Sequence, residues 1–326
     1  MWIDEPYDVT ALGELLVDFT DCGRSADGMR VFEQNPGGAP ANVLCALAGF
    51  GMKTAFIGKV GQDAQGDFLR GVLREKGVDT TGLIRDPSVF TTLAFVTLSA
   101  SGERGFSFAR KPGADAELSP DELNTEILER TRVFHFGSLS LTREPARSAT
   151  LRALEVAKGA GALVSYDPNY RAPLWDSREE AAAGMRGVLG LADMVKLSAE
   201  ETALLTGREE PAAAALELLR AGADVAVVTL GKNGALVRTR EGWDVVQAPN
   251  CPVVDTTGAG DAFWAGFLYK LLESGLSPGE LPLKTAKSCA LFGNLTACLC
   301  IQKRGAVPAM PNLERVRALS RRYGPF

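Results

Sequence analysis

The chain has 326 residues, of which 46% are hydrophobic, so it is long enough to bury a sizeable core. Its formal net charge is −5 and it contains no block of Lys and Arg, which argues against nucleic acid and anionic membranes as partners. The N-terminal stretch is acidic, unlike a signal peptide, and the apolar stretch 289–301 is shorter than the roughly 18 residues that suggest a membrane span. We therefore expect a soluble, cytoplasmic protein.

The cysteines and the single histidine predict no metal centre. No two cysteines form a CxxC pair, so reduced, buried thiols are favoured over a metal site or disulfides. The cysteines are Cys22, Cys45, Cys251, Cys289, Cys298 and Cys300. His135 lies in a strand-like apolar run and is expected in the core, so a general base in this chain would be a carboxylate.

Short β-branched or aromatic runs alternate with longer helical patterns, which is typical of a parallel sheet covered by helices. In chain order we expect a strand from residue 7, a helix over 41–51, a strand over 53–61, a helix over 63–77, a strand over 133–141, a helix over 146–161, strands over 162–169 and 193–198, a helix over 200–207, a strand over 224–231 and a helix containing Asp261. No repeat or linker interrupts this pattern, so residues 1–326 are expected to form one α/β domain.

Two stretches, at about 14–34 and 88–112, depart from this alternation of strands and helices. Both alternate like strands, the second around a polar turn at Ser101-Gly102-Glu103, and no helix separates their strands. We expect a small β-sheet lid that stands off the main body.

The stretch "VVDTTGAGDAFWAGFLYKLL" (253–272) predicts a phosphate-binding turn. Gly258, Ala259 and Gly260 precede a helix, and the free amides of a helix N-terminus bind anions. A tight turn without a ligand is the alternative. Asp261, an acid beside an anion site, favours chemistry, because it could accept a proton from a hydroxyl that attacks phosphorus. We expect the helix dipole to keep Asp261 ionised.

Common nucleotide-binding motifs are absent. Residues 49–54 and 229–234 both miss the Walker A pattern, and no GxGxxG follows the first strand, which argues against a dinucleotide enzyme.

"NPGGAPANVLCALAGFG" (35–51) and "DTTGAGDAFWAGF" (255–267) resemble the two signatures of the ribokinase-like, or PfkB, carbohydrate kinases. Further segments resemble fructokinases in particular: 13–19, 108–115, 134–141, 165–175, 196–207 and 303–311. The resemblance implies a three-layer α/β/α ribokinase-like fold with a mostly parallel central sheet and a β-sheet lid over the sugar. It also implies ATP, Mg²⁺ and transfer of the γ-phosphoryl group to a sugar hydroxyl.

By this resemblance Asp261 is the catalytic base, and Gly258, Ala259 and Gly260 form the anion hole. The sugar-contact positions are Asp18, Gly37, Gly38, Asn42 and Arg110, and Arg171 is expected to bridge sugar and γ-phosphate. The alternatives are a solvated loop acid, turn glycines, a helix-start amide and a surface arginine. For Arg171 the alternative is an ion pair with Asp167 or Asp176.

The resemblance also assigns nucleotide and cation positions. The nucleotide positions are Lys196, Ser198, Glu201, Thr229, Gly231, Gly234 and Asn294, with Glu201 organising Mg²⁺. A monovalent cation, such as potassium, would fall at Asp255, Thr257, Cys300, Lys303 and Gly305. Ala309 replaces a serine of the ribokinase pattern, which removes one oxygen and leaves potassium activation open.

The favoured function is phosphorylation of D-fructose at its 6-hydroxyl by ATP. A sibling kinase for 2-keto-3-deoxygluconate, ribose or a nucleoside is an alternative, as is a catalytically silent regulatory relative. Silent relatives tend to lose the base, and Asp261 is present. Exposed lid strands make a homodimer through the lid a further expectation.

Overall fold

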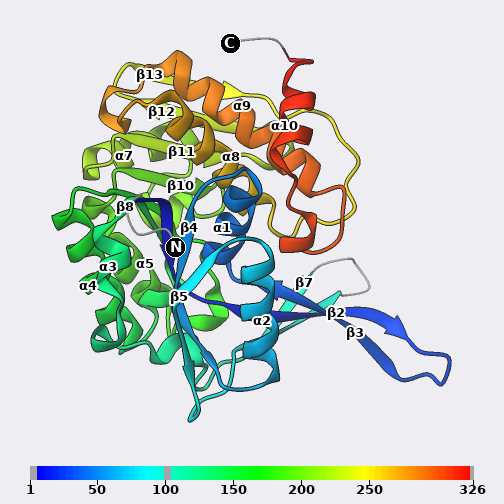
Figure 1. The fold of residues 1–326 in the computed structure, drawn as a ribbon. Helices are drawn as coiled ribbons and strands as arrows, with labels where there is room; N and C mark the ends of the chain where they lie inside the picture. Colours follow the sequence, from blue (N-terminus) through cyan, green and yellow to red (C-terminus); the bar gives the residue numbers. More distant parts are fainter. Residues whose placement is uncertain (1–5, 99–103, 324–326) are drawn as a thin grey trace.

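The computed structural model describes residues 6–98 and 104–323 and has two sheets (Figure 1). The expected turn at Ser101-Gly102-Glu103 lies outside the described residues. The larger sheet has nine strands in the order β13-β12-β11-β10-β9-β8-β1-β4-β5. Its strands are β1 (Tyr7–Leu12), β4 (Thr54–Gly61), β5 (Asp79–Asp86), β8 (Thr131–Gly137), β9 (Leu163–Asp167), β10 (Met194–Ser198), β11 (Val225–Thr229), β12 (Ala235–Thr239) and β13 (Gly242–Val246).

All neighbouring strands from β11 to β5 run parallel, and β12 is antiparallel to both of its neighbours. The prediction of a mostly parallel central sheet is therefore confirmed. Parallel strands direct their carboxyl ends to one edge, where α/β proteins bind ligands.

Helices cover both faces of this sheet, because its strands are apolar on both sides. In β11, Val225 and Val227 pack against one layer of helices, whereas Ala226 and Val228 pack against the other. The first layer contains α1 (Ala39–Gly49), α2 (Ala64–Glu75), α8 (Ala259–Ser274), α9 (Leu283–Cys300) and α10 (Leu313–Ser320). The second contains α3 (Thr125–Glu129), α4 (Ala146–Gly159), α5 (Arg178–Arg186), α6 (Thr202–Thr206) and α7 (Pro211–Ala221). The three-layer α/β/α architecture is confirmed.

The smaller sheet, which we call the lid sheet, has the order β3-β2-β6-β7 and projects from the body in Figure 1. It consists of β2 (Leu16–Arg24), β3 (Arg30–Gly37), β6 (Leu93–Leu98) and β7 (Arg104–Ala109). Strand β2 is antiparallel to β3 and parallel to β6. No single crossover helix connects β2 directly to β6. A separate small sheet was predicted from these parts of the chain, although β3 continues past residue 34 to Gly37.

His135 belongs to the core, as predicted. Its ring is buried and its Nδ1 lies 3.0 Å from the Ser165 hydroxyl, which also accepts a hydrogen bond from Trp264 Nε1 at 2.8 Å. Burial lowers the pKa of His135 to about 4.

All six cysteines are free thiols, but only four are buried, because Cys22 and Cys251 are half-buried. No helix within the described residues is long and apolar enough to cross a membrane, and the apolar stretch 289–301 is mostly the last turns of α9.

Two glycines allow α8 and α9 to pack closely beneath the sheet. A Cβ added at Gly266 of α8 would lie 2.5 Å from Thr296 Oγ1 and 3.0 Å from the Cα atom of Gly293. A Cβ at Gly293 would in turn lie 2.7 Å from the carbonyl oxygen of Phe263. The position of α8, and with it the turn at its N-terminus, therefore depends on this contact.

The variant Gly266→Ala tests this packing. Alanine raises helix propensity, yet its methyl group must displace α9, so we expect the free energy of unfolding in urea to fall by about 1–3 kcal/mol. Gly71→Ala is a matched control on α2, where an added Cβ meets no atom within 4 Å. That variant should gain about 0.5–1 kcal/mol. Equal stabilisation of both variants would contradict the proposed close approach.

Candidate active site

A cavity of about 370 Å³ lies at the carboxyl ends of β9, β10 and β11, between the lid sheet and the N-termini of α1 and α8. It brings together most of the residues singled out in the sequence. They are Asp18, Gly38, Asn42, Arg171, Lys196, Ser198, Glu201, Thr229, Gly231, Thr257, Gly258, Ala259, Gly260 and Asp261.

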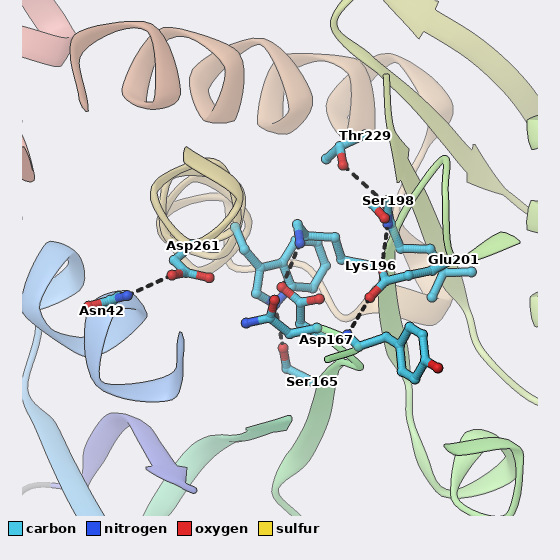
Figure 2. A network of polar contacts seen from close by, with 12 residues as sticks. Asn42, Ser165, Asp167, Lys196, Ser198, Glu201, Thr229 and Asp261 are labelled. Carbon is cyan, nitrogen blue, oxygen red and sulfur yellow. Dashed lines mark hydrogen bonds and ion pairs between the residues drawn. The ribbon is translucent and has the colours of Figure 1, made fainter. Parts of the chain in front are cut away.

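Asp261 lies buried in the first turn of α8, beside the amide turn. Gly258 caps this helix with φ +74°, a left-handed conformation that suits glycine, and a Cβ there would come within 2.7 Å of Ala306. One oxygen of Asp261 accepts a hydrogen bond from Asn42 Nδ2 at 2.8 Å (Figure 2). The contact joins α8 to α1 and fixes the orientation of the carboxyl group.

The pKa of Asp261 shifts in a direction opposite to the one that the helix dipole predicts. Burial, followed by the charge of Asp167, raises it to about 6, and the Asn42 hydrogen bond and Lys196 only partly offset this. Asp261 was expected to be kept ionised by the helix dipole, whereas its pKa is raised, because burial disfavours the charged form. Asp261 is still mostly ionised at neutral pH, and it is a stronger base than an exposed aspartate.

Lys196 places a buried positive charge beside the amide turn. Its Nζ pairs with Asp167 at 2.5 Å and lies 3.3 Å from the point where a Cβ of Gly260 would stand. Burial lowers the pKa of Lys196, but the charges of Asp167 and Glu201 outweigh this and raise it above its usual value. Lys196 thus places a cation beside Gly260, in the turn 258–260 that lines the same cavity.

Glu201 holds two loops of the cavity together. Its carboxylate accepts the backbone N–H groups of Tyr170, after β9, at 2.6 Å and of Ser198, at the end of β10, at 2.7 Å (Figure 2). Thr229 lies on the next strand, and its hydroxyl donates to the Leu197 carbonyl at 3.3 Å.

Asp18 and Arg171 also line the cavity and interact electrostatically with each other and with Asp261. Burial raises the pKa of Asp18 to about 6, and the charge of Arg171 counters this in part. The half-buried Arg171 donates to the Tyr170 carbonyl at 3.0 Å, and within the described residues no ion pair joins it to an acid. The alternative of a structural ion pair is therefore not supported, since Asp167 pairs with Lys196 and Asp176 with Arg143.

Three of the predicted sugar and nucleotide positions lie behind the cavity wall. A Cβ at Gly37 would collide with the Asp18 carboxylate, so the observed position of the Asp18 side chain requires a glycine here. Asn294 donates to the carbonyls of Val246 at 2.9 Å and Gln247 at 3.3 Å, and a Cβ at Gly234 would collide with the same segment.

Arg110 does not line this cavity. It forms a buried ion pair with Asp115 at 2.8 Å and donates to Thr142 Oγ1 and the Leu139 carbonyl. It lines a neighbouring hollow with Lys111 and Arg143.

The residues assigned to a monovalent cation lie together behind the turn. Asp255 accepts hydrogen bonds from the backbone and hydroxyl of Thr257 at 2.9 and 2.7 Å and from the Gly305 amide at 3.0 Å. Cys300 Sγ lies 3.8 Å from the Thr257 carbonyl, and the Lys303 amide donates to the Cys300 carbonyl.

The lining residues that the sequence analysis did not assign to the site include Glu14, Asp167 and Asn169. Glu14 is 3% exposed, and its Oε1 accepts the Ala39 amide at the start of α1 at 2.8 Å. Burial raises its pKa to about 7. Gly38, with φ +114°, leaves no room for a Cβ over the Glu14 carbonyl. The segments 13–19 and 165–175 were the available signal, since the first begins directly after β1 and the second contains the carboxyl end of β9.

Comparisons with known proteins agree with this site. Residues 7–313 match the pfkB family of carbohydrate kinases. The chain is 43% identical over 308 residues to probable fructokinase-2 of Arabidopsis thaliana, covering 93% of this chain and 92% of that protein. The chain therefore belongs to the PfkB family of carbohydrate kinases.

Solved structures show the same fold. Fructokinase of Xylella fastidiosa with bound ATP superposes with a TM-score of 0.88 at 33% identity, over 97% of this chain and 98% of that one. A double mutant of fructokinase from Vibrio cholerae with fructose, ADP and potassium gives a TM-score of 0.85 at 33% identity, over 97% and 99% of the two chains.

The raised pKa values of Asp18 and Asp261 predict the acid side of the pH profile. Both groups are ionised above about pH 6, so kcat/KM should fall as pH drops below that value, by about tenfold per pH unit for each group that must be ionised. Steady-state rates between about pH 4.5 and 8 would measure this, with circular dichroism to confirm that the protein stays folded. A flat profile down to about pH 4.5 would rule out a base with this pKa.

Proposed function

We propose that this protein is a fructokinase that transfers the γ-phosphoryl group of ATP to the 6-hydroxyl of D-fructose, forming ADP and D-fructose 6-phosphate. The observation that carries the proposal is the buried carboxylate of Asp261 beside the amide turn 258–260, in a chain 43% identical to a fructokinase. Phosphoryl transfer needs both parts, because the enzyme positions the nucleophile, takes up its proton and neutralises charge.

The cavity fits ATP with a divalent cation. Asp167 Oδ1 is buried and has no hydrogen-bond partner among the described residues, so it can face a cation or its water. The described residues hold no group of three acids, histidines or cysteines that could bind a metal alone, which suits Mg²⁺, an ion usually held by phosphates and water as well as by protein. ATP with Mg²⁺ supplies the phosphoryl group and offsets its charge.

In this proposal each residue of the cavity has a separate role in phosphoryl transfer. Asp261 accepts the proton of the sugar hydroxyl as that oxygen attacks. The amides of Gly258, Ala259 and Gly260, with Lys196 beside them, stabilise the negative charge of the group in transfer. Arg171 bridges the sugar and the γ-phosphate, and Glu201 keeps the loops after β9 and β10 at the right distance for Mg²⁺ and phosphates.

The sugar is bound by Asp18, Gly38 and Asn42. Gly37 leaves the space that the Asp18 side chain occupies. Arg110 belongs to the proposal only if it leaves Asp115 when the lid sheet closes over sugar. Ser198, Thr229, Gly231, Gly234 and Asn294 form the nucleotide side, and Asp255, Thr257, Cys300, Lys303 and Gly305 hold a monovalent cation such as potassium. The ligands of this proposal are supported by related fructokinase structures, one with bound ATP and another with fructose, ADP and potassium.

A sibling kinase for an acidic sugar is less well supported. An acid such as 2-keto-3-deoxygluconate needs cationic partners, and Arg110 is committed to Asp115 while Lys196 is committed to Asp167. A catalytically silent relative is disfavoured because Asp261 and the turn 258–260 are intact.

The proposal also includes a cytoplasmic location and a homodimer through the lid sheet, where Met29 and Val31 expose apolar side chains.

A coupled assay of ADP release tests the proposed substrate. Fructose should give the highest kcat/KM in a panel that also contains ribose, adenosine and 2-keto-3-deoxygluconate, because the hydroxyls of a neutral hexose suit Asp18 and Asn42, whereas an acidic sugar would meet the Asp18 carboxylate and Arg171 is assigned to the γ-phosphate. Each sugar is assayed with potassium and with sodium at equal ionic strength. Faster turnover of another sugar would overturn the choice of fructose. ADP release that does not depend on any of the sugars would contradict sugar kinase activity.

The variant Asp261→Asn tests the base. We expect kcat to fall by about 10²–10⁴ with little change in KM, because an amide cannot accept the proton. The raised pKa means that ionising Asp261 at neutral pH costs the folded state on the order of 2–3 kcal/mol, so the variant should be more stable at pH 7. Thermal unfolding serves as the control that the variant is folded, and near wild-type turnover would remove Asp261 from this role.

A further inference from the structure

The lid sheet places two cavity-lining side chains in one row. Asp18 of β2 pairs with Ala94 of β6, and Ala94 pairs with Phe108 of β7. Residues that lie opposite one another on neighbouring strands point to the same face of a sheet, and both Asp18 and Phe108 line the catalytic cavity. Ala94, which is buried between them, has only a methyl group. Phe108 is therefore the large side chain that bounds the cavity on the β7 side of this row.

A second hollow, of about 430 Å³, adjoins the cavity at Phe108. It lies between β7 and the turn η4 (Ala172–Leu174), since Ser107 and Phe108 line it from one side and Pro173 and Leu174 from the other. Among the described residues that line either space, only Phe108 lines both. Its side chain thus forms the partition between the catalytic cavity and the hollow.

The hollow is cationic. Arg110, Lys111 and Arg143 line it together with one acid, Asp176. Asp115 offsets the charge of Arg110. Arg143 approaches Asp176 only at 3.9 Å, and their side chains are 49% and 84% exposed, so this pair contributes little. Within the described residues no ion pair joins Lys111 to an acid. An anionic group in the hollow would therefore meet two positive charges, those of Lys111 and Arg143.

We propose that Phe108 sets the length of the sugar that this kinase accepts, by separating the catalytic cavity from a cationic hollow that fits a phosphate group on the far end of the sugar. The inference rests on the proposed function, because it takes the 6-hydroxyl of fructose to lie at Asp261. C1 and C6 are at opposite ends of fructose, so C1 then points away from α8 and towards the lid sheet. The ring of Phe108 closes the way from there into the hollow.

The experiment compares fructose, fructose 1-phosphate and 1-O-methylfructose as substrates of the wild-type protein and of Phe108→Ala. In each case the 6-hydroxyl attacks the γ-phosphorus, its proton passes to Asp261 and ADP leaves, so fructose 1-phosphate gives fructose 1,6-bisphosphate. The wild type should prefer fructose. Alanine opens the partition, so the variant should raise kcat/KM for both derivatives, relative to fructose, by roughly tenfold or more.

The charge of the hollow is tested in the same variant. Lys111→Glu, added to Phe108→Ala, should remove most of the gain with fructose 1-phosphate and leave the gain with 1-O-methylfructose unchanged, because only the phosphate meets residue 111 as a charge. A gain with 1-O-methylfructose alone in Phe108→Ala would overturn the assignment of the hollow to phosphate.

Phe95→Ala is the matched control. Phe95 follows Ala94 on β6, so its ring lies on the opposite face of the lid sheet, where it stacks on Phe19 at 5.5 Å. Its loss should leave the ratio of the three rates unchanged. Phe108→Val is a smaller truncation that suits a strand, and it should show the same gain on a smaller scale even if Phe108→Ala does not fold.

Two results would overturn the partition. One is a wild-type protein that phosphorylates fructose 1-phosphate as fast as fructose. The other is a folded Phe108 variant that turns over fructose but gains nothing with either derivative. If folded wild-type protein released no ADP with any sugar, the proposed function itself would be wrong.

Discussion

The site depends on one interaction: the buried carboxylate of Asp261 accepts a hydrogen bond from Asn42 at 2.8 Å, close to the charges of the Lys196–Asp167 pair. Ionising a buried carboxylate costs free energy, and the raised pKa of about 6 reflects this cost. Because its pKa is closer to neutral, the ionised carboxylate is a stronger base than an exposed aspartate. The surrounding structure keeps α1 and α8 in the positions that this geometry requires.

Charges alternate through the cavity. The charge of Arg171 acts on both Asp18 and Asp261, and Lys196 pairs with Asp167 and acts on Asp261. A sugar that enters between Asp18 and Asn42 meets acceptors, whereas an anionic group near 258–260 meets amides and a cation. The sugar side and the phosphate side therefore favour different ligands, and Asp261, the proposed base, interacts with charges on both sides.

The sequence was sufficient for the layered fold and for the position of Asp261, the proposed base, because periodic apolar runs and the 253–272 turn are local signals. It could not reveal that desolvation, rather than the helix dipole, governs Asp261, since burial is a property of the folded chain. It placed Arg110 on the sugar, whereas Asp115, five residues away, pairs with it. Glu14 and Asp167 were missed because their partners, Ala39 and Lys196, are distant in the chain.

The most direct measurement is a crystal structure with fructose and a non-hydrolysable ATP analogue. If Asp261 is the base, one of its oxygens lies within hydrogen-bonding distance of the 6-hydroxyl, on the line to the terminal phosphorus, while the other still accepts from Asn42. A carboxylate that faces away from the hydroxyl, with no water between them, would contradict the account.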